Sequence, residues 1–150
     1  MSTIKHKILF VCVHNSARSQ MAEALLEKYG SGEFEAESAG LEPGRLNPNA
    51  VHVMKEVGID ISGKESKDVF DLFKAGRLYS AVISVCDEAS SERCPIFPGV
   101  AKRIAWSFPD PSGFSGSKEQ ILEQTRQVRN DIETKIKEFV REARDISFWT

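Results

Sequence analysis

The chain has 150 residues, 41% of them hydrophobic and 28% charged, which predicts one globular domain, residues 1–150, with a core of its own. Its formal net charge of −2, with Lys and Arg scattered among Asp and Glu, excludes the basic face that nucleic acid or an anionic membrane surface selects. Because no apolar run approaches the roughly 20 residues of a membrane-spanning helix and no signal-peptide cleavage pattern follows the N-terminus, we expect a cytoplasmic protein, by default a monomer.

Strand-like and helix-like patterns alternate along the chain. Residues 7–11 form a continuous apolar run, as expected of a strand buried on both faces. Residues 17–29 place apolar side chains at helical spacing before a stop at Gly30. The later patterns predict strands at 34–38, 81–85 and 103–106, helices at 48–57 and 69–73, and a long amphipathic helix at 118–144. This alternation predicts an α/β fold, a single three-layer sandwich with a parallel sheet between helices.

Ligands of open α/β sheets bind beyond the carboxyl ends of the strands. Three segments are expected to meet at that edge: the loop after 7–11, the segment after Val85 and the segment after Trp106. The three cysteines of the chain are an odd number, which fits a framework of structural disulfides poorly. The count favours thiols that are kept reduced for chemistry.

The loop 12–17 leads from the first strand into the first helix. Its backbone N–H groups and the positive end of the helix dipole converge on one point, which suits an oxyanion. Arg18, in the first helical turn, can add a two-pronged hydrogen bond to phosphate or arsenate. The same positive field favours the thiolate of Cys12, which is then a nucleophile at neutral pH. Ser16 and Ser19 can donate hydrogen bonds to this thiolate.

A plainer interpretation of a Cys-x5-Arg match is a buried core cysteine followed by a surface arginine. The strand before the loop, the helix after it and Ser19 directly after Arg18 favour the anion site instead. Asn15 suits a left-handed backbone position where the loop curls. His14 either tunes the charge of the loop or points to solvent, and we prefer solvent.

Residues 11–23 read Val-Cys-Val-His-Asn-Ser-Ala-Arg-Ser-Gln-Met-Ala-Glu. This stretch resembles the low-molecular-weight protein tyrosine phosphatase superfamily and, within it, the arsenate reductases. Further matches extend over nearly the whole chain, among them Ser38-Ala39-Gly40, Asn47-Pro48, Cys94-Pro95 and Asp110-Pro111. The resemblance implies a four-stranded parallel sheet in the order 2-1-3-4. It also implies that Cys12 is the nucleophile and that the oxyanion is bound by the loop, at Val13, His14, Asn15, Ser16, Ala17 and Arg18.

Two activities occur in this superfamily. A phosphatase needs one cysteine to form a phosphocysteine and an acid for the leaving group, and Asp110 matches the position of the family's acid. Reduction of arsenate takes two electrons, so a second thiol must reach the first, and Cys86 is the candidate. Tyrosine phosphatases usually carry aromatic residues after the Asp-Pro dipeptide, whereas this chain has Ser112-Gly113. This difference favours reduction.

The resemblance implies a relay of three thiols. Cys12 attacks arsenate, Cys86 attacks the Cys12 sulfur and releases arsenite, and Cys94 then attacks Cys86. The segment 87–93 is polar and rich in small residues, so we expect it to be pliable enough to bring the last two thiols together. Thioredoxin, glutaredoxin or a small thiol would reduce the resulting disulfide.

Other interpretations stay open. Cys86 and Cys94 could be packing thiols or zinc ligands, but the three histidines are scattered along the sequence, so no metal site is predicted. A phosphatase using the same loop with Asp110 is the main alternative function. A non-catalytic module that recognises a phosphorylated residue through the loop is another.

No cofactor is required for the relay. Some thioredoxin-linked relatives hold a potassium ion near the loop, and the residues at the matching places are Asn15, Glu23, Ser38 and Asp68. Seven residues separate Cys86 from Cys94, one more than in those relatives. The sequence therefore leaves both the reductant and the cation open.

Overall fold

The computed structural model describes residues 5–86 and 93–150. One parallel sheet has the spatial order β2-β1-β3-β4. Its strands are β1 (His6–Cys12), β2 (Phe34–Gly40), β3 (Ala81–Ser84) and β4 (Lys102–Ala105). The predicted α/β class, the parallel sheet and the strand order are confirmed.

The strand register brings the carboxyl ends of three strands to one edge of the sheet. Cys12 at the end of β1 pairs with Gly40 at the end of β2, and Val11 pairs with Ser84 at the end of β3. The Val85 N–H donates to the Val11 carbonyl at 2.8 Å. This hydrogen bond keeps the chain beside β1 after β3 has ended, directly before Cys86.

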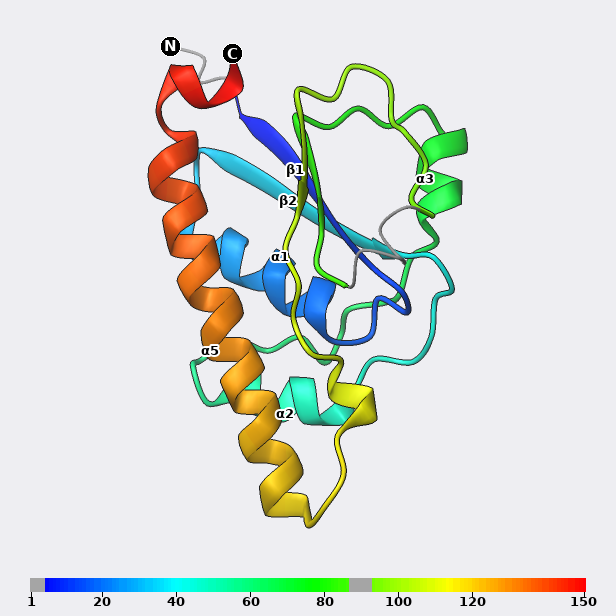
Figure 1. Cartoon of the computed structure of the whole chain (residues 1–150), viewed down its shortest axis with the longest axis vertical. Helices are drawn as coiled ribbons and strands as arrows, with labels where there is room; N and C mark the ends of the chain where they lie inside the picture. Colours follow the sequence, from blue (N-terminus) through cyan, green and yellow to red (C-terminus); the bar gives the residue numbers. More distant parts are fainter. Residues whose placement is uncertain (1–4, 87–92) are drawn as a thin grey trace.

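Helices cover both faces of the sheet (Figure 1). The elements on one face are α1 (Arg18–Tyr29), α2 (Pro48–Lys55) and α5 (Lys118–Ala143), and α3 (Val69–Lys74) lies on the other. The pleat of β1 explains the layers, because Ile8 and Phe10 join the core cluster under α1 and α5, whereas Leu9 and Val11 join the cluster under α3. A strand with both faces buried must be apolar throughout, which is the pattern seen in the sequence.

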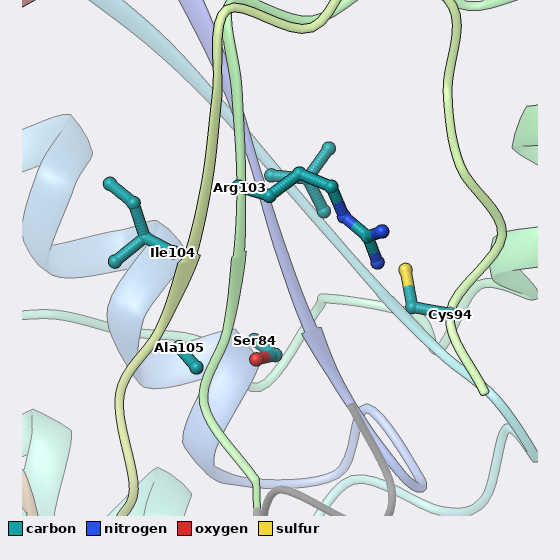
Figure 2. A pocket seen from close by; sticks show the side chains of 6 residues that line it. Ser84, Cys94, Arg103, Ile104 and Ala105 are labelled. Carbon is teal, nitrogen blue, oxygen red and sulfur yellow. The ribbon is translucent and has the colours of Figure 1, made fainter. Parts of the chain in front are cut away.

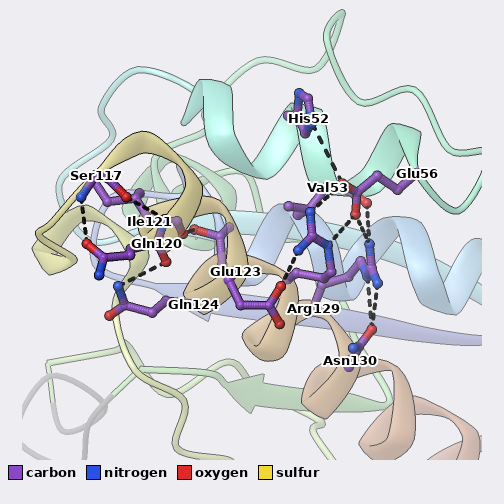
Figure 3. Close-up of polar contacts among 12 residues, drawn as sticks. His52, Val53, Glu56, Ser117, Gln120, Ile121, Glu123, Gln124, Arg129 and Asn130 are labelled. Atoms are coloured by element: carbon purple, nitrogen blue, oxygen red, sulfur yellow. Dashed lines mark hydrogen bonds and ion pairs between the residues drawn. The ribbon is translucent and has the colours of Figure 1, made fainter.

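A carboxylate at the end of α2 ties this helix to α5 (Figure 3). Glu56 accepts hydrogen bonds of 2.8 Å from both Nε and Nη2 of Arg126 and from Nη1 of Arg129. The buried Arg129 also donates to the Val53 carbonyl at 2.7 Å. The Arg126 hydrogen bonds, followed by those of Arg129, outweigh the effect of burial and lower the pKa of Glu56 to about 2.

Side-chain caps set where two of these helices begin. The Asn47 side chain accepts from the Asn49 N–H at 2.8 Å, directly before Pro48 at the first position of α2. Ser117 and Gln120 form a reciprocal capping box at the start of α5. Both starts match the predicted ones.

Predicted and observed element boundaries agree within two residues, the largest differences being β2, which continues to Gly40, and α2, which ends at Lys55. Two short 3₁₀ helices, Pro111–Gly113 and Ile146–Trp149, were not predicted, because three or four residues carry no periodicity. The segment 87–93, expected to be pliable, lies outside the described residues apart from Arg93. Within the described part of the chain, no helix has the length and apolar character to cross a membrane.

Candidate active site

The loop after β1 is held with its carbonyl groups turned outward. The carbonyl oxygens of Cys12, Val13 and His14 accept from the backbone N–H groups of residues 41, 42 and 44 at 3.1, 2.7 and 2.9 Å, and that of Ser16 accepts from Asn47 at 2.8 Å. In a trans peptide the C=O and the following N–H point in opposite directions. The N–H groups of residues 13, 14, 15 and 17 therefore turn away from the 41–47 segment, as an anion-binding loop requires.

Asn15 donates one hydrogen bond to the Cys12 sulfur and orients Ser19, which donates a second one. Its backbone is left-handed, with φ 53°, as predicted, and its N–H donates to Cys12 Sγ at 3.1 Å. The Lys67 N–H donates to Asn15 Oδ1 at 2.9 Å, which fixes the orientation of the amide, so Asn15 Nδ2 donates to Ser19 Oγ at 2.7 Å. The Ser19 hydroxyl is then left to donate its own proton to Cys12 Sγ, 2.8 Å away. Both donors stabilise negative charge on the sulfur.

Arg18 is the first residue of α1, and its side chain is only 7% exposed. Its Nη1 donates to the Phe108 carbonyl at 3.2 Å, and its Nη2 lies 3.4 Å from Asp110 Oδ2. These contacts bring the segment after β4 to the loop, as the sheet-edge argument predicted. A guanidinium buried beside a single carboxylate has donors left for an oxyanion.

Asp110 is a carboxylate in this arrangement. Burial raises its pKa, but hydrogen bonds from the N–H and hydroxyl of Ser112, together with the charges of Arg18 and His14, outweigh burial and hold the pKa below its usual value. The group therefore carries a negative charge at neutral pH and accepts hydrogen bonds there.

The remaining loop residues have different surroundings. His14 is exposed, as preferred from the sequence, and its Nδ1 lies 2.9 Å from the Glu42 carbonyl. Val13 and Ser16 are partly buried, and Ala17 is buried directly before α1. These residues contribute backbone to the loop, and Ser19 is the hydroxyl placed on Cys12.

The three cysteines are buried thiols that lie in two different layers. Cys12 and Cys86 are 2% and 3% exposed and belong to the core cluster under α1 and α5, together with Trp106. Cys94 is 6% exposed and belongs to the cluster on the α3 face, together with Phe97. The structure thus brings two of the candidate thiols into one layer and places the third on the opposite face of the sheet.

Two residues support the loop that were not selected from the sequence as site residues. A Cβ on Gly40 would lie 2.8 Å from the Val13 carbonyl oxygen and 2.9 Å from the Asn15 nitrogen, so the loop packs on β2 at a distance that only glycine allows. The buried Gln20 donates to the Asn15 carbonyl at 3.2 Å and to the Glu65 carbonyl at 3.1 Å. Gly40 does belong to a matched motif, but its contact with the loop depends on tertiary structure.

Three of the residues expected near a potassium ion have partners within the protein. Ser38 donates to one oxygen of Glu23 at 2.9 Å, and the Lys64 ammonium pairs with the other oxygen. Asp68 caps α3 through the Phe70 N–H at 2.8 Å. The Glu23 carboxylate thus already has a cationic partner, and a bound potassium ion stays a prediction. Within residues 5–86 and 93–150, no group of three or more His, Cys, Asp and Glu side chains could hold a metal ion.

Comparisons with known proteins agree with this geometry. The profile of the family described as low molecular weight phosphotyrosine protein phosphatase matches residues 7–146. An arsenate reductase of Shouchella clausii (strain KSM-K16) is 44% identical over 137 residues, covering 90% of this chain and 95% of the relative.

Solved structures are similar over most of the chain. An arsenate reductase in a phosphate-binding state aligns with a TM-score of 0.73 and 34% identity, covering 92% of this chain and 98% of that one. A thioredoxin-dependent arsenate reductase of Corynebacterium glutamicum has a TM-score of 0.61 and 27% identity, covering 91% of this chain and 64% of that one. This chain therefore belongs to the low molecular weight phosphotyrosine protein phosphatase family, and its relatives by sequence and structure include arsenate reductases.

Proposed function

We propose that this protein is an enzyme that reduces arsenate to arsenite through Cys12, Cys86 and Cys94. The observation that carries the proposal is a second buried thiol, Cys86, in the same core cluster as Cys12, since a phosphatase of this family needs only the first. The name of the relative that is 44% identical over 90% of this chain supports the same substrate.

The first step takes place in the loop. The Cys12 thiolate, held by the donors of Asn15 and Ser19, attacks the arsenic of an arsenate bound by the loop N–H groups and Arg18. An S–As bond forms, and a hydroxyl group of the arsenate takes up a proton from solvent and leaves as water. The two donors point at the Cys12 sulfur, which is the atom that carries the negative charge before the attack.

Two thiol exchanges complete the relay. The Cys86 thiolate attacks the Cys12 sulfur, so an S–S bond forms while the S–As bond breaks and its electron pair stays on arsenic, which leaves as arsenite. The Cys94 thiolate then attacks the Cys86 sulfur and returns a thiolate to Cys12. Two thiols are oxidised to one disulfide as arsenic(V) becomes arsenic(III).

An external thiol reductant must then reduce the Cys86–Cys94 disulfide. We infer that thioredoxin is this reductant, because one structural relative is named as thioredoxin-dependent. Glutaredoxin and small thiols are the alternatives. A compartment that keeps thiols reduced is needed for turnover, which supports the expected cytoplasmic location.

The second candidate is phosphatase activity, favoured by the position of Asp110 beside Arg18. Phosphoryl transfer to Cys12 needs a protonated acid for the leaving group. Because Ser112 and Arg18 hold the pKa of Asp110 below its usual value, this acid is mostly ionised at neutral pH. We expect any hydrolysis of an aryl phosphate to be fastest in acid and to fall as the pH rises.

The test is the arsenate-dependent consumption of NADPH by the reduced protein with thioredoxin and thioredoxin reductase. The proposal expects turnover that Cys86→Ser abolishes and that Ser31→Ala, at an exposed serine, leaves unchanged. Glutaredoxin with glutathione replaces thioredoxin in a parallel reaction. Absence of turnover with every reductant, with aryl phosphate hydrolysis that survives Cys86→Ser, would establish the phosphatase instead.

A further inference from the structure

A small cavity on the α3 face of the sheet contains Cys94 and the side chain of an arginine from β4 (Figure 2). Its volume is about 190 Å³, and its lining residues are Val82, Ser84, Cys94, Arg103, Ile104 and Ala105. The Arg103 side chain extends along the cavity, and its guanidinium points at the Cys94 sulfur. The cavity therefore joins a buried thiol to a cation supplied by another strand.

Two opposing effects act on the Cys94 thiol. Burial in the apolar cluster with Leu72 and Phe97 raises its pKa, and the charge and hydrogen bonding of Arg103 act against burial. The Cys94 thiol donates a hydrogen bond to the Pro95 carbonyl, with 3.6 Å between the sulfur and the oxygen. The guanidinium is thus placed to stabilise the sulfur once that proton has left.

Other titratable groups near Cys94 do not replace Arg103. The Tyr79 hydroxyl, from the same cluster, is neutral because burial raises its pKa. The neighbouring Arg93 pairs with Glu42 at 2.9 Å. None of the ion pairs between described residues includes Arg103. Its charge is therefore not cancelled by an acidic partner in this part of the chain.

We propose that Arg103 is a positioning residue for the third thiol of the relay: its guanidinium holds the Cys94 thiolate in the cavity and so speeds the attack of Cys94 on Cys86. This inference rests on the proposed arsenate reductase function. In the step concerned, the Cys94 sulfur loses its proton to solvent, forms a bond to the Cys86 sulfur and breaks the Cys12–Cys86 bond. The Cys12 sulfur leaves with the electron pair, so no further oxidant is needed.

The size of the effect can be bounded. For each unit by which loss of Arg103 raises the pKa of Cys94, the thiolate fraction at neutral pH falls about tenfold, but a more basic thiolate is a better nucleophile, with a Brønsted coefficient of about 0.4–0.5. The attack is then slower by about threefold for each unit. Because burial raises the pKa of Cys94, this deficit persists at any pH at which the thiol is largely protonated in both proteins.

The experiment is a single turnover with arsenate in the absence of external reductant, quenched with N-ethylmaleimide and read by mapping the disulfides with mass spectrometry. At pH 7, Arg103→Gln should accumulate the Cys12–Cys86 disulfide and convert it to Cys86–Cys94 at least about threefold more slowly than the unaltered protein. Arg103→Lys, which keeps the positive charge, should restore most of the rate. Arg141→Gln, at an exposed arginine of α5, is the matched control.

Conversion of Arg103→Gln at the unaltered rate at pH 7, or a rate in Arg103→Lys that stays as low as in Arg103→Gln, overturns the inference. If the unaltered protein forms no disulfide with arsenate, the proposed function fails and Arg103 is tested separately. The pH dependence of iodoacetamide alkylation of Cys94 is then compared in Cys12→Ser/Cys86→Ser proteins with and without Arg103→Gln. A higher midpoint without Arg103 supports its role, and an unchanged midpoint rejects it.

Discussion

The reactivity of Cys12 depends on a chain of hydrogen bonds that starts from the backbone. Because the Lys67 N–H orients the Asn15 amide, Asn15 donates to Ser19, and Ser19 donates to the Cys12 sulfur. Asn15 and Ser19 are buried, so water does not compete with the hydrogen bonds that these two residues donate. A residue that lies far from Cys12 in the sequence thus sets the direction of a proton at the nucleophile.

Ser19→Ala should slow alkylation of Cys12 and its attack on arsenate by about threefold to tenfold. The reason is the loss of one hydrogen bond to a charged sulfur, worth about 1.5–3 kcal/mol. The measurement is the rate of iodoacetamide alkylation of the Cys12 peptide at pH 6.5, followed by mass spectrometry, with Ser31→Ala as control. An unchanged rate would show that the 2.8 Å contact does not stabilise the thiolate.

Whole elements hold the loop in shape. The end of β2 lies under the loop, and Gly40 leaves room for the Val13 carbonyl and the Asn15 nitrogen. The chain that follows, residues 41–47, binds the outward carbonyls. The anion-binding conformation is therefore imposed from outside the loop by a strand and its continuation.

Gly40→Ala should displace the loop and reduce arsenate-dependent turnover at least about tenfold, with a loss of about 1–3 kcal/mol in the free energy of unfolding. The control is Gly63→Ala, because a Cβ there meets no atom within 4 Å. Turnover and urea denaturation are measured on both variants. Full activity in Gly40→Ala would contradict the close contact between β2 and the loop.

The tie between α2 and α5 gives a prediction for stability. Glu56→Gln should lower the free energy of unfolding at pH 7 by about 1–2 kcal/mol, since its carboxylate binds two arginines. The folded pKa of about 2 lies below the unfolded value of 4.5. The contribution is therefore complete above about pH 4.5 and is lost as the pH falls toward 2.

Urea denaturation at pH 7 and at pH 3 tests this linkage. The difference between the unaltered protein and Glu56→Gln should shrink at the lower pH, while Glu35→Gln, at an exposed carboxylate of β2, should have little effect at either. An equal difference at both pH values would mean that ionisation of Glu56 does not stabilise the fold.

At the scale of the whole molecule, the second and third thiols of the proposed relay lie on opposite faces of the sheet. Cys86 packs with Trp106 on the α1 and α5 side, whereas Cys94 packs with Phe97 on the α3 side. A disulfide requires Cα atoms within about 7 Å. Formation of Cys86–Cys94 therefore has to remove at least one of these thiols from its apolar layer.

Oxidation by arsenate should accordingly change the surroundings of Trp106, which is 9% exposed and lies between Phe10 and Phe139. In a Trp149→Phe protein Trp106 is the remaining tryptophan, and its emission should shift to longer wavelength after one turnover with arsenate. Cys86→Ser should prevent the shift. Identical spectra of the reduced and oxidised proteins would argue that Cys94 moves and that the layer around Trp106 stays intact.

The sequence by itself determined the α/β class, most element boundaries and the identity of the loop residues. These features depend on apolar periodicity and on a strand followed by a helix, and both are patterns of residues that are neighbours in the sequence. Tertiary structure alone decided which groups touch: the orientation of Asn15 by Lys67, the packing of Gly40 on the loop, and the separation of Cys86 and Cys94 into two layers. Alternation along a strand indicates that two faces exist, but contacts between residues distant in sequence form only when the sheet and its helices have packed.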